Sequence, residues 1–85
     1  MLLVWDENAW EDYLWWQTHD RKTLKRINLL IKDIQCNGNT GLGKPEALRY
    51  NFAGYWSRRT TSEHQLVYKV DGSVIRIAAC RYHYG

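Results

Sequence analysis

Hydrophobic and polar residues change their spacing once along the chain, from a helical period in the first half to alternation in the second. The short apolar run LLVW predicts a first strand at residues 2–5. Asp6 then precedes ENAWEDYLWWQTH, residues 7–19, whose acidic first turn predicts a capped helix. The residues expected to face inward recur at helical spacing: Trp10, Tyr13, Leu14 and Gln17.

A second helix is predicted directly after the first. Asp20 is a suitable N-cap for RKTLKRINLLIKDIQ, residues 21–35. The glycines and the single proline of CNGNTGLGKP then end the helix. Its expected apolar stripe consists of Leu24, Ile27, Leu30 or Ile31, and Ile34.

Alternation takes over beyond this loop. YWSRRT and EHQLVYKV read as successive strands joined by a short turn, and DGS turns into the last strand, VIRIAACRYHY. The predicted fold is α+β: a helical hairpin packed on one face of a small antiparallel β-sheet, in the order β-α-α-β-β-β. An extra short strand is expected near Glu46. The whole chain, 1–85, is interpreted as one domain.

The period of two assigns side chains to the faces of the sheet. In the last strand, one face is expected to hold Ile75, Ile77 and Ala79 and to continue through Arg81 to His83. Two helices can cover only one face, so the other can carry polar residues from several strands side by side. That exposed face is a candidate site.

Charge is distributed unevenly between the two halves of the chain. Residues 1–42 hold five Lys or Arg against six Asp or Glu, whereas residues 43–85 hold seven against three. The second half is therefore the one expected to meet an anion. The alternative is that its arginines only solvate one face of a sheet.

The cysteines and the start of the chain indicate a cytoplasmic protein. Cys36 and Cys80 have no paired spacing, so neither a zinc site nor a disulfide framework is expected. MLLVW is short and acidic residues follow it, so neither a signal peptide nor a membrane span is expected.

The candidate chemistry is acid-base catalysis on a phosphodiester. The serines lack a nucleophile-elbow context, and GLGKPE lacks the Walker spacing. What remains in the basic half is a carboxylate, Glu46 or Glu63, and a histidine, His64 or His83. Such groups can deprotonate a ribose 2′-OH and protonate the leaving 5′ oxygen, which requires neither a metal nor another cofactor.

Each candidate also has a structural interpretation, and spacing alone leaves both open. Glu46 can be solvent-facing or paired with Arg49. His64 can be a structural hydrogen-bonding residue at the start of a strand, which its position favours. His83 can be a solvated residue near the chain end.

Three segments resemble the YoeB toxins of bacterial type II toxin-antitoxin systems, within the RelE-like superfamily. They are WDENAWEDYLWWQTHDRK, GKPEALRYNFAGYWSRRTTSEHQLVY and IAACRYHY, and the similarity extends over essentially the whole chain. The resemblance implies a small α+β endoribonuclease that binds in the ribosomal A site, cleaves mRNA there and stops translation. It also implies neutralisation by a YefM-like antitoxin, a homodimer, and contact with operator DNA only through the antitoxin complex.

The resemblance assigns roles to individual residues. Glu46 matches the proposed general base, His83 the general acid, and Tyr84 the aromatic residue beside that acid. Arg49 and Arg59 match basic positions that can hold phosphate, and Arg81 is a further candidate for that role.

Gln65 is a departure, because the family usually has arginine there. Losing a charged donor at a reaction centre typically lowers the rate by roughly 100-fold to 1000-fold, so a retained but reduced activity is expected. The alternatives are a non-catalytic RNA- or ribosome-binding module and a regulatory subunit of a toxin-antitoxin complex.

A catalytic tail must also be held in place. If the end of the chain carries the acid, it should be pinned to its neighbour through Tyr82 or His83.

Overall fold

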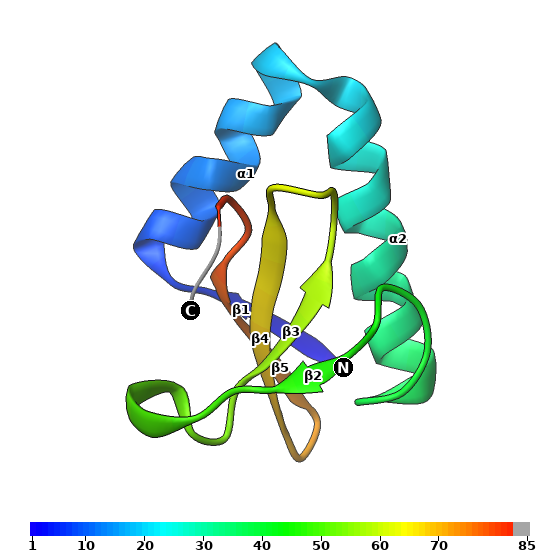
Figure 1. Cartoon of the computed structure of the whole chain (residues 1–85), viewed down its shortest axis with the longest axis vertical. Helices are drawn as coiled ribbons and strands as arrows, with labels where there is room; N and C mark the ends of the chain where they lie inside the picture. Colours follow the sequence, from blue (N-terminus) through cyan, green and yellow to red (C-terminus); the bar gives the residue numbers. More distant parts are fainter. Residues whose placement is uncertain (83–85) are drawn as a thin grey trace.

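Two helices pack against a five-stranded sheet in the computed structural model, which describes residues 1–82 (Figure 1). The sheet order is β1-β5-β4-β3-β2. The first strand runs parallel to the last and the other pairs are antiparallel, so the predicted α+β fold is confirmed with a mixed sheet. The elements are β1 Leu2–Trp5, α1 Glu7–His19, α2 Arg21–Asn37, β2 Glu46–Ala47, a 3-10 helix Tyr50–Phe52, β3 Trp56–Arg59, β4 Gln65–Asp71 and β5 Val74–Ala79.

The two helices begin in different ways. Asp20 caps α2 as predicted: its carboxylate accepts from the Thr23 backbone N–H at 3.1 Å and from the Thr23 hydroxyl at 2.7 Å. Asp6 precedes α1 but its side chain makes no cap hydrogen bond. The Asp6 carboxylate instead pairs with Arg76 of β5 at 2.8 Å, which ties the start of α1 to the sheet.

The core lies between the helices and one face of the sheet. The predicted stripe of α2 is confirmed, since Ile27, Leu30, Ile31 and Ile34 are all buried. Fully burying a side chain of this kind contributes roughly 1.5–3 kcal/mol. From the sheet, the core cluster takes Leu66, Tyr68, Ile75, Ile77 and Cys80.

The inward face predicted for α1 is confirmed only at Tyr13, which packs against the core, and Gln17 is exposed. Trp10 and Leu14 are exposed, and the residues that reach the core are Ala9 and Trp16, with Tyr13 half-buried between them. The spacing from Ala9 to Tyr13 to Trp16 satisfies the helical period as well as the expected set does. Aromatic residues surround this helix, so periodicity alone did not distinguish the two faces.

A bulge changes the face assignment in β5. Tyr68 pairs with Ile77, but the preceding Val67 pairs with Ala79, so Ala78 is an extra residue. An extra residue inverts the alternation that follows. Ala79 therefore does not share the face of Ile77 as predicted, and Cys80 joins the core instead. The strand also ends at Ala79, earlier than expected.

Candidate active site on the far face of the sheet

The sheet face turned away from the helices, called here the far face, carries a row of cross-strand partners. Glu46 of β2 pairs with Ser57 of β3, which pairs with Val67 of β4, and Val67 in turn pairs with Ala79 of β5. Directly opposite partners project from the same side of a sheet. Val67 and Ala79 are buried but lie outside the core cluster beneath the helices. Glu46 at the end of this row is exposed.

Arg59 and Gln65 join Glu46 on the far face. They are direct register partners across β3 and β4. Arg59 lies two residues beyond Ser57, so the strand period places it on the same side as Glu46. Arg59 is exposed and Gln65 is half-buried. Three of the predicted site residues, from three strands, are thus brought to one face, where a carboxylate, a guanidinium and an amide are available together.

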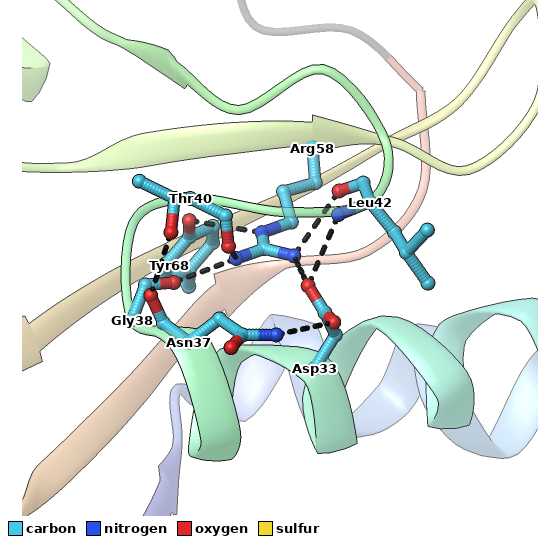
Figure 2. A network of polar contacts seen from close by, with 7 residues as sticks. All are labelled: Asp33, Asn37, Gly38, Thr40, Leu42, Arg58 and Tyr68. Atoms are coloured by element: carbon cyan, nitrogen blue, oxygen red, sulfur yellow. Dashed lines mark hydrogen bonds and ion pairs between the residues drawn. The ribbon is translucent and has the colours of Figure 1, made fainter.

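A buried arginine, Arg58, lies on the side of β3 that faces the core. Arg58 is fully buried, so the expectation that the arginines only solvate a sheet face is wrong at this position. Its guanidinium pairs with Asp33 of α2, and this bond is the main cause that holds the pKa of the Asp33 carboxyl below its usual value of 3.8. The same guanidinium donates to the carbonyls of Gly38, Thr40 and Leu42 and to the Tyr68 hydroxyl (Figure 2).

This network orders the loop that leads to Glu46. Figure 2 shows the loop after α2 folded around the Arg58 guanidinium, with Asp33 also accepting from the Leu42 backbone N–H at 3.0 Å. The Arg59 backbone N–H then donates to the Gly43 carbonyl at 2.6 Å. A Cβ at Gly43 would meet the Arg59 carbonyl at 3.1 Å, and its φ of +81° favours glycine. The loop therefore sets where β2 begins relative to β3.

A basic hollow of about 400 Å³ adjoins Arg59. It is lined by Arg26 of α2, residues 43–44 and residues 59–62. No ion pair among residues 1–82 neutralises its three cations, Arg26, Lys44 and Arg59. The Thr60 hydroxyl oxygen is buried without a hydrogen-bond partner. The sequence did not predict this hollow, because no spacing pattern connects α2 with the turn after β3.

The segment after β5 is anchored to α1. The Trp16 indole N–H donates to the Cys80 carbonyl at 2.9 Å, and the Asp12 carboxylate accepts the Cys80 backbone N–H. Burial nevertheless raises the pKa of Asp12 above its usual value. The Arg81 guanidinium lies 3.7 Å from the centre of the Trp15 ring and donates to the Tyr82 hydroxyl at 3.0 Å. These contacts occupy the Cys80 backbone and explain why the strand ends early.

The chain then meets the start of β4 again at Tyr82. The Gln65 backbone N–H donates to the Tyr82 carbonyl at 3.0 Å, and the Tyr82 backbone N–H donates to His64 Nδ1 at 2.7 Å. The prediction that the tail is pinned to its neighbour is confirmed at Tyr82. The interpretation of His64 as a structural hydrogen-bonding residue at the start of a strand also agrees with these contacts.

The remaining predicted site residues have varied positions. Arg49 is exposed just beyond β2, and within residues 1–82 no ion pair joins it to Glu46. Glu63 is exposed in the turn before β4. Arg81 packs on Trp15 of α1. His83 and Tyr84 lie outside the described residues.

The described part of the chain offers neither a metal cluster nor a membrane helix. Across residues 1–82, no three His, Cys, Asp or Glu side chains gather in a way that could hold a metal ion. Neither helix in this part is long and apolar enough to cross a membrane.

Comparison with protein families gives a match that covers nearly the whole chain. Residues 5–84 match the model of the YoeB-like toxin of bacterial type II toxin-antitoxin systems. A similar curated protein is Toxin YoeB of Escherichia coli K12, which is 54% identical over 84 residues; the alignment covers 99% of this chain and 100% of that protein.

Solved structures agree with the family match. The YoeB-YefM complex from Staphylococcus aureus has a chain with a TM-score of 0.92 and 48% identity, with 99% of each chain covered. The YoeB dimer from the same organism has a TM-score of 0.93 and 48% identity, with coverage of 99% of this chain and 98% of that chain.

Proposed function

This chain belongs to the YoeB-like toxins of bacterial type II toxin-antitoxin systems, and on that premise we propose that it is a ribosome-dependent endoribonuclease. It binds in the ribosomal A site, cuts the mRNA there by metal-independent acid-base chemistry and so stops translation. No cofactor takes part in the proposed reaction. The place of action is the cytoplasm, where ribosomes translate mRNA.

One observation carries this proposal: Glu46, Arg59 and Gln65 share the far face of the sheet. Phosphodiester cleavage requires a base that deprotonates the attacking 2′-OH, and cations or hydrogen-bond donors that stabilise the negative charge developing on the phosphoryl oxygens. The Gln65 backbone N–H also donates to the Tyr82 carbonyl. The chain therefore lies beside the start of β4 at the residue before His83.

The proposed reaction is an internal displacement at phosphorus. The Glu46 carboxylate takes the proton of the ribose 2′-OH, and the 2′ oxygen forms a bond to phosphorus. The bond from phosphorus to the 5′ oxygen breaks, and His83 supplies the proton that this oxygen needs. The products are a 2′,3′-cyclic phosphate and a 5′-hydroxyl end.

Other residues hold the substrate during this step. Arg59 and Arg49 bind phosphate oxygens, and Gln65 donates a neutral hydrogen bond to the charge that develops at phosphorus. Tyr84 stacks on the nucleotide beside the acid. Arg81, whose guanidinium lies over Trp15, contributes through anchoring of the tail. The basic hollow beside Arg59 takes a neighbouring phosphate of the RNA.

The experiment uses purified ribosomes stalled on a defined mRNA with wild type, Glu46→Gln or His83→Gln. The wild type should cut inside translated codons and leave ends that are ligated only after a kinase has phosphorylated the 5′-hydroxyl. Each substitution should lower the single-turnover rate by about 10²–10⁴-fold. Glu11→Gln, which removes an exposed carboxylate of α1, is the matched control.

Other results would contradict the proposal. Ends that carry a 5′-phosphate would indicate hydrolysis by an activated water instead of attack by the 2′-OH. Inhibition of translation without cleavage, retained in His83→Ala, would support a non-catalytic ribosome-binding module. Absence of any effect on translation would support a purely regulatory subunit.

The partners follow from the same premise. A YefM-like antitoxin neutralises the toxin by laying an extended segment over it; the solved YoeB-YefM complex of S. aureus supports this choice of partner. The free toxin forms a homodimer, as YoeB of S. aureus does, and meets operator DNA only through the antitoxin complex. Light scattering of the isolated toxin should give a mass near twice 10.1 kDa.

A further inference from the structure

His64 holds the chain one residue before His83. Its Nδ1 accepts the Tyr82 backbone N–H at 2.7 Å, while the next residue, Gln65, donates its backbone N–H to the Tyr82 carbonyl at 3.0 Å. Both main-chain polar groups of Tyr82 are thus bound by two consecutive residues at the start of β4. The His64 ring supplies the acceptor that a paired strand would otherwise provide, at a point where β5 has already ended.

Tyr82 needs this support because its backbone is unusual. Its φ is +65°, in the left-handed region that non-glycine residues rarely adopt. Tyr82 is also exposed, so burial of its side chain contributes little to holding it there. The two backbone hydrogen bonds from the start of β4 therefore have a large share in fixing the direction in which the chain continues.

The orientation of the His64 ring is set by its neighbours. The ring meets Trp16 edge-to-face, with centroids 4.8 Å apart, and lies 5.2 Å from the Tyr82 ring. Because Nδ1 accepts a hydrogen bond, the ring hydrogen must be on Nε2 and the ring must be neutral. Asp12 of α1 interacts electrostatically with the ring, and Glu63 is exposed beside it in sequence.

From these contacts we propose that His64 is a positioning residue for the acid-bearing tail. Its neutral imidazole accepts the Tyr82 N–H and so fixes the main chain at Tyr82, the last residue before the proposed acid, His83. This rests on the proposed function only for the role of His83. The contact with Tyr82 is a property of the isolated protein and can be measured without any reaction.

Two substitutions separate this role from simple packing. His64→Asn places an amide oxygen where Nδ1 stands, so the Tyr82 N–H keeps an acceptor. His64→Gln is closer to histidine in length but places its amide near the Nε2 position, so that acceptor is lost. Both variants lose the ring contacts with Trp16 and Tyr82, and both should therefore show a similar fall in melting temperature.

The first measurement is hydrogen exchange of the Tyr82 amide by NMR. Protection should be retained in His64→Asn and lost in His64→Gln. Equal protection in the two variants would overturn the proposal.

The second measurement is single-turnover cleavage on stalled ribosomes, together with ribosome affinity. His64→Gln should lower the cleavage rate at least tenfold with unchanged affinity, and His64→Asn should remain within about threefold of wild type. Equal rates in His64→Gln and wild type would overturn the proposal. Absence of cleavage by the wild type would instead overturn the proposed function, and the exchange measurement would still decide whether His64 positions the tail.

Discussion

Arg59 and Gln65 stand directly opposite each other on β3 and β4, on the sheet face that also carries Glu46. Arg59 is exposed, and within residues 1–82 it makes no ion pair. A neutral partner leaves this guanidinium available for a phosphate. A second arginine at position 65 would double the positive charge presented there, and the two cross-strand neighbours would repel each other when no RNA is bound.

Gln65→Arg should therefore raise activity and lower stability together. Ribosome-dependent cleavage is expected to rise by up to about 100-fold, because a charged donor replaces a neutral one beside the developing charge. The free energy of unfolding should fall by roughly 0.2–1 kcal/mol, the range for like charges directly opposite in a sheet. Single-turnover cleavage and urea unfolding measure the two effects.

The matched control is Gln35→Arg, which adds the same charge on an exposed position of α2. It should change neither quantity appreciably. An unchanged cleavage rate in Gln65→Arg would mean that Arg59, or the ribosome itself, already supplies the charge that the reaction needs.

The basic hollow beside Arg59 predicts a contribution to RNA affinity. Lys44→Gln and Arg26→Gln should each weaken ribosome binding and reduce the slope of log affinity against log salt by about 0.7, the value for one phosphate contact on a single strand. Lys25→Gln, an exposed neighbour on α2 that does not line the hollow, is the control. Equal slopes in all three variants would show that the RNA does not enter the hollow.

Sequence patterns predicted the helices and strands better than they predicted contacts. The α2 stripe followed from its period because polar residues clearly separate its two faces. Arg59 and Gln65 share one face because β3 and β4 pair without interruption between them. The bulge at Ala78 inverted the face of Ala79, and no local signal in the run of small residues marks it.

The sequence did not predict the structural role of Arg58 either. Arg58 and Arg59 are adjacent and chemically identical, yet one is fully buried and the other is exposed. The difference comes from strand alternation combined with a tertiary partner, Asp33, that lies 25 positions away. Only the fold places that carboxylate under β3.

The Asp33–Arg58 pair predicts a specific pH dependence of stability. The pKa of Asp33 is lowered in the folded protein, first by the Arg58 hydrogen bond, from a usual value of 3.8. A lowered native pKa means that this stabilisation is fully present above the unfolded value and is lost as the pH falls through the native one. Asp33→Asn should thus be less stable than wild type near neutral pH, with a gap that shrinks below pH 3.8.

Urea unfolding at a series of pH values measures that gap. Asp71→Asn, an exposed acidic residue at the end of β4 outside both ion pairs, is the control for the general effect of removing a carboxylate. A gap that stays constant down to the acid limit would mean that Asp33→Asn acts through the loop backbone and not through the charge.

Arg58→Met should lower the melting temperature by roughly 5 °C or more at any pH, because three loop carbonyls lose their donor.

The two cysteines should differ sharply in reactivity, which tests the anchoring of the last segment. Cys36 is exposed on α2, whereas Cys80 is buried, donates its thiol to the Ala9 carbonyl and has its pKa raised to about 12 by burial. Since the thiolate is the reactive form, iodoacetamide at about pH 8 should label Cys36 at least about 100-fold faster than Cys80. In denaturant the two rates should converge. Native Cys36→Ser should remain almost unlabelled, and rapid labelling of that variant would show that the segment from Cys80 onward detaches from α1 in solution.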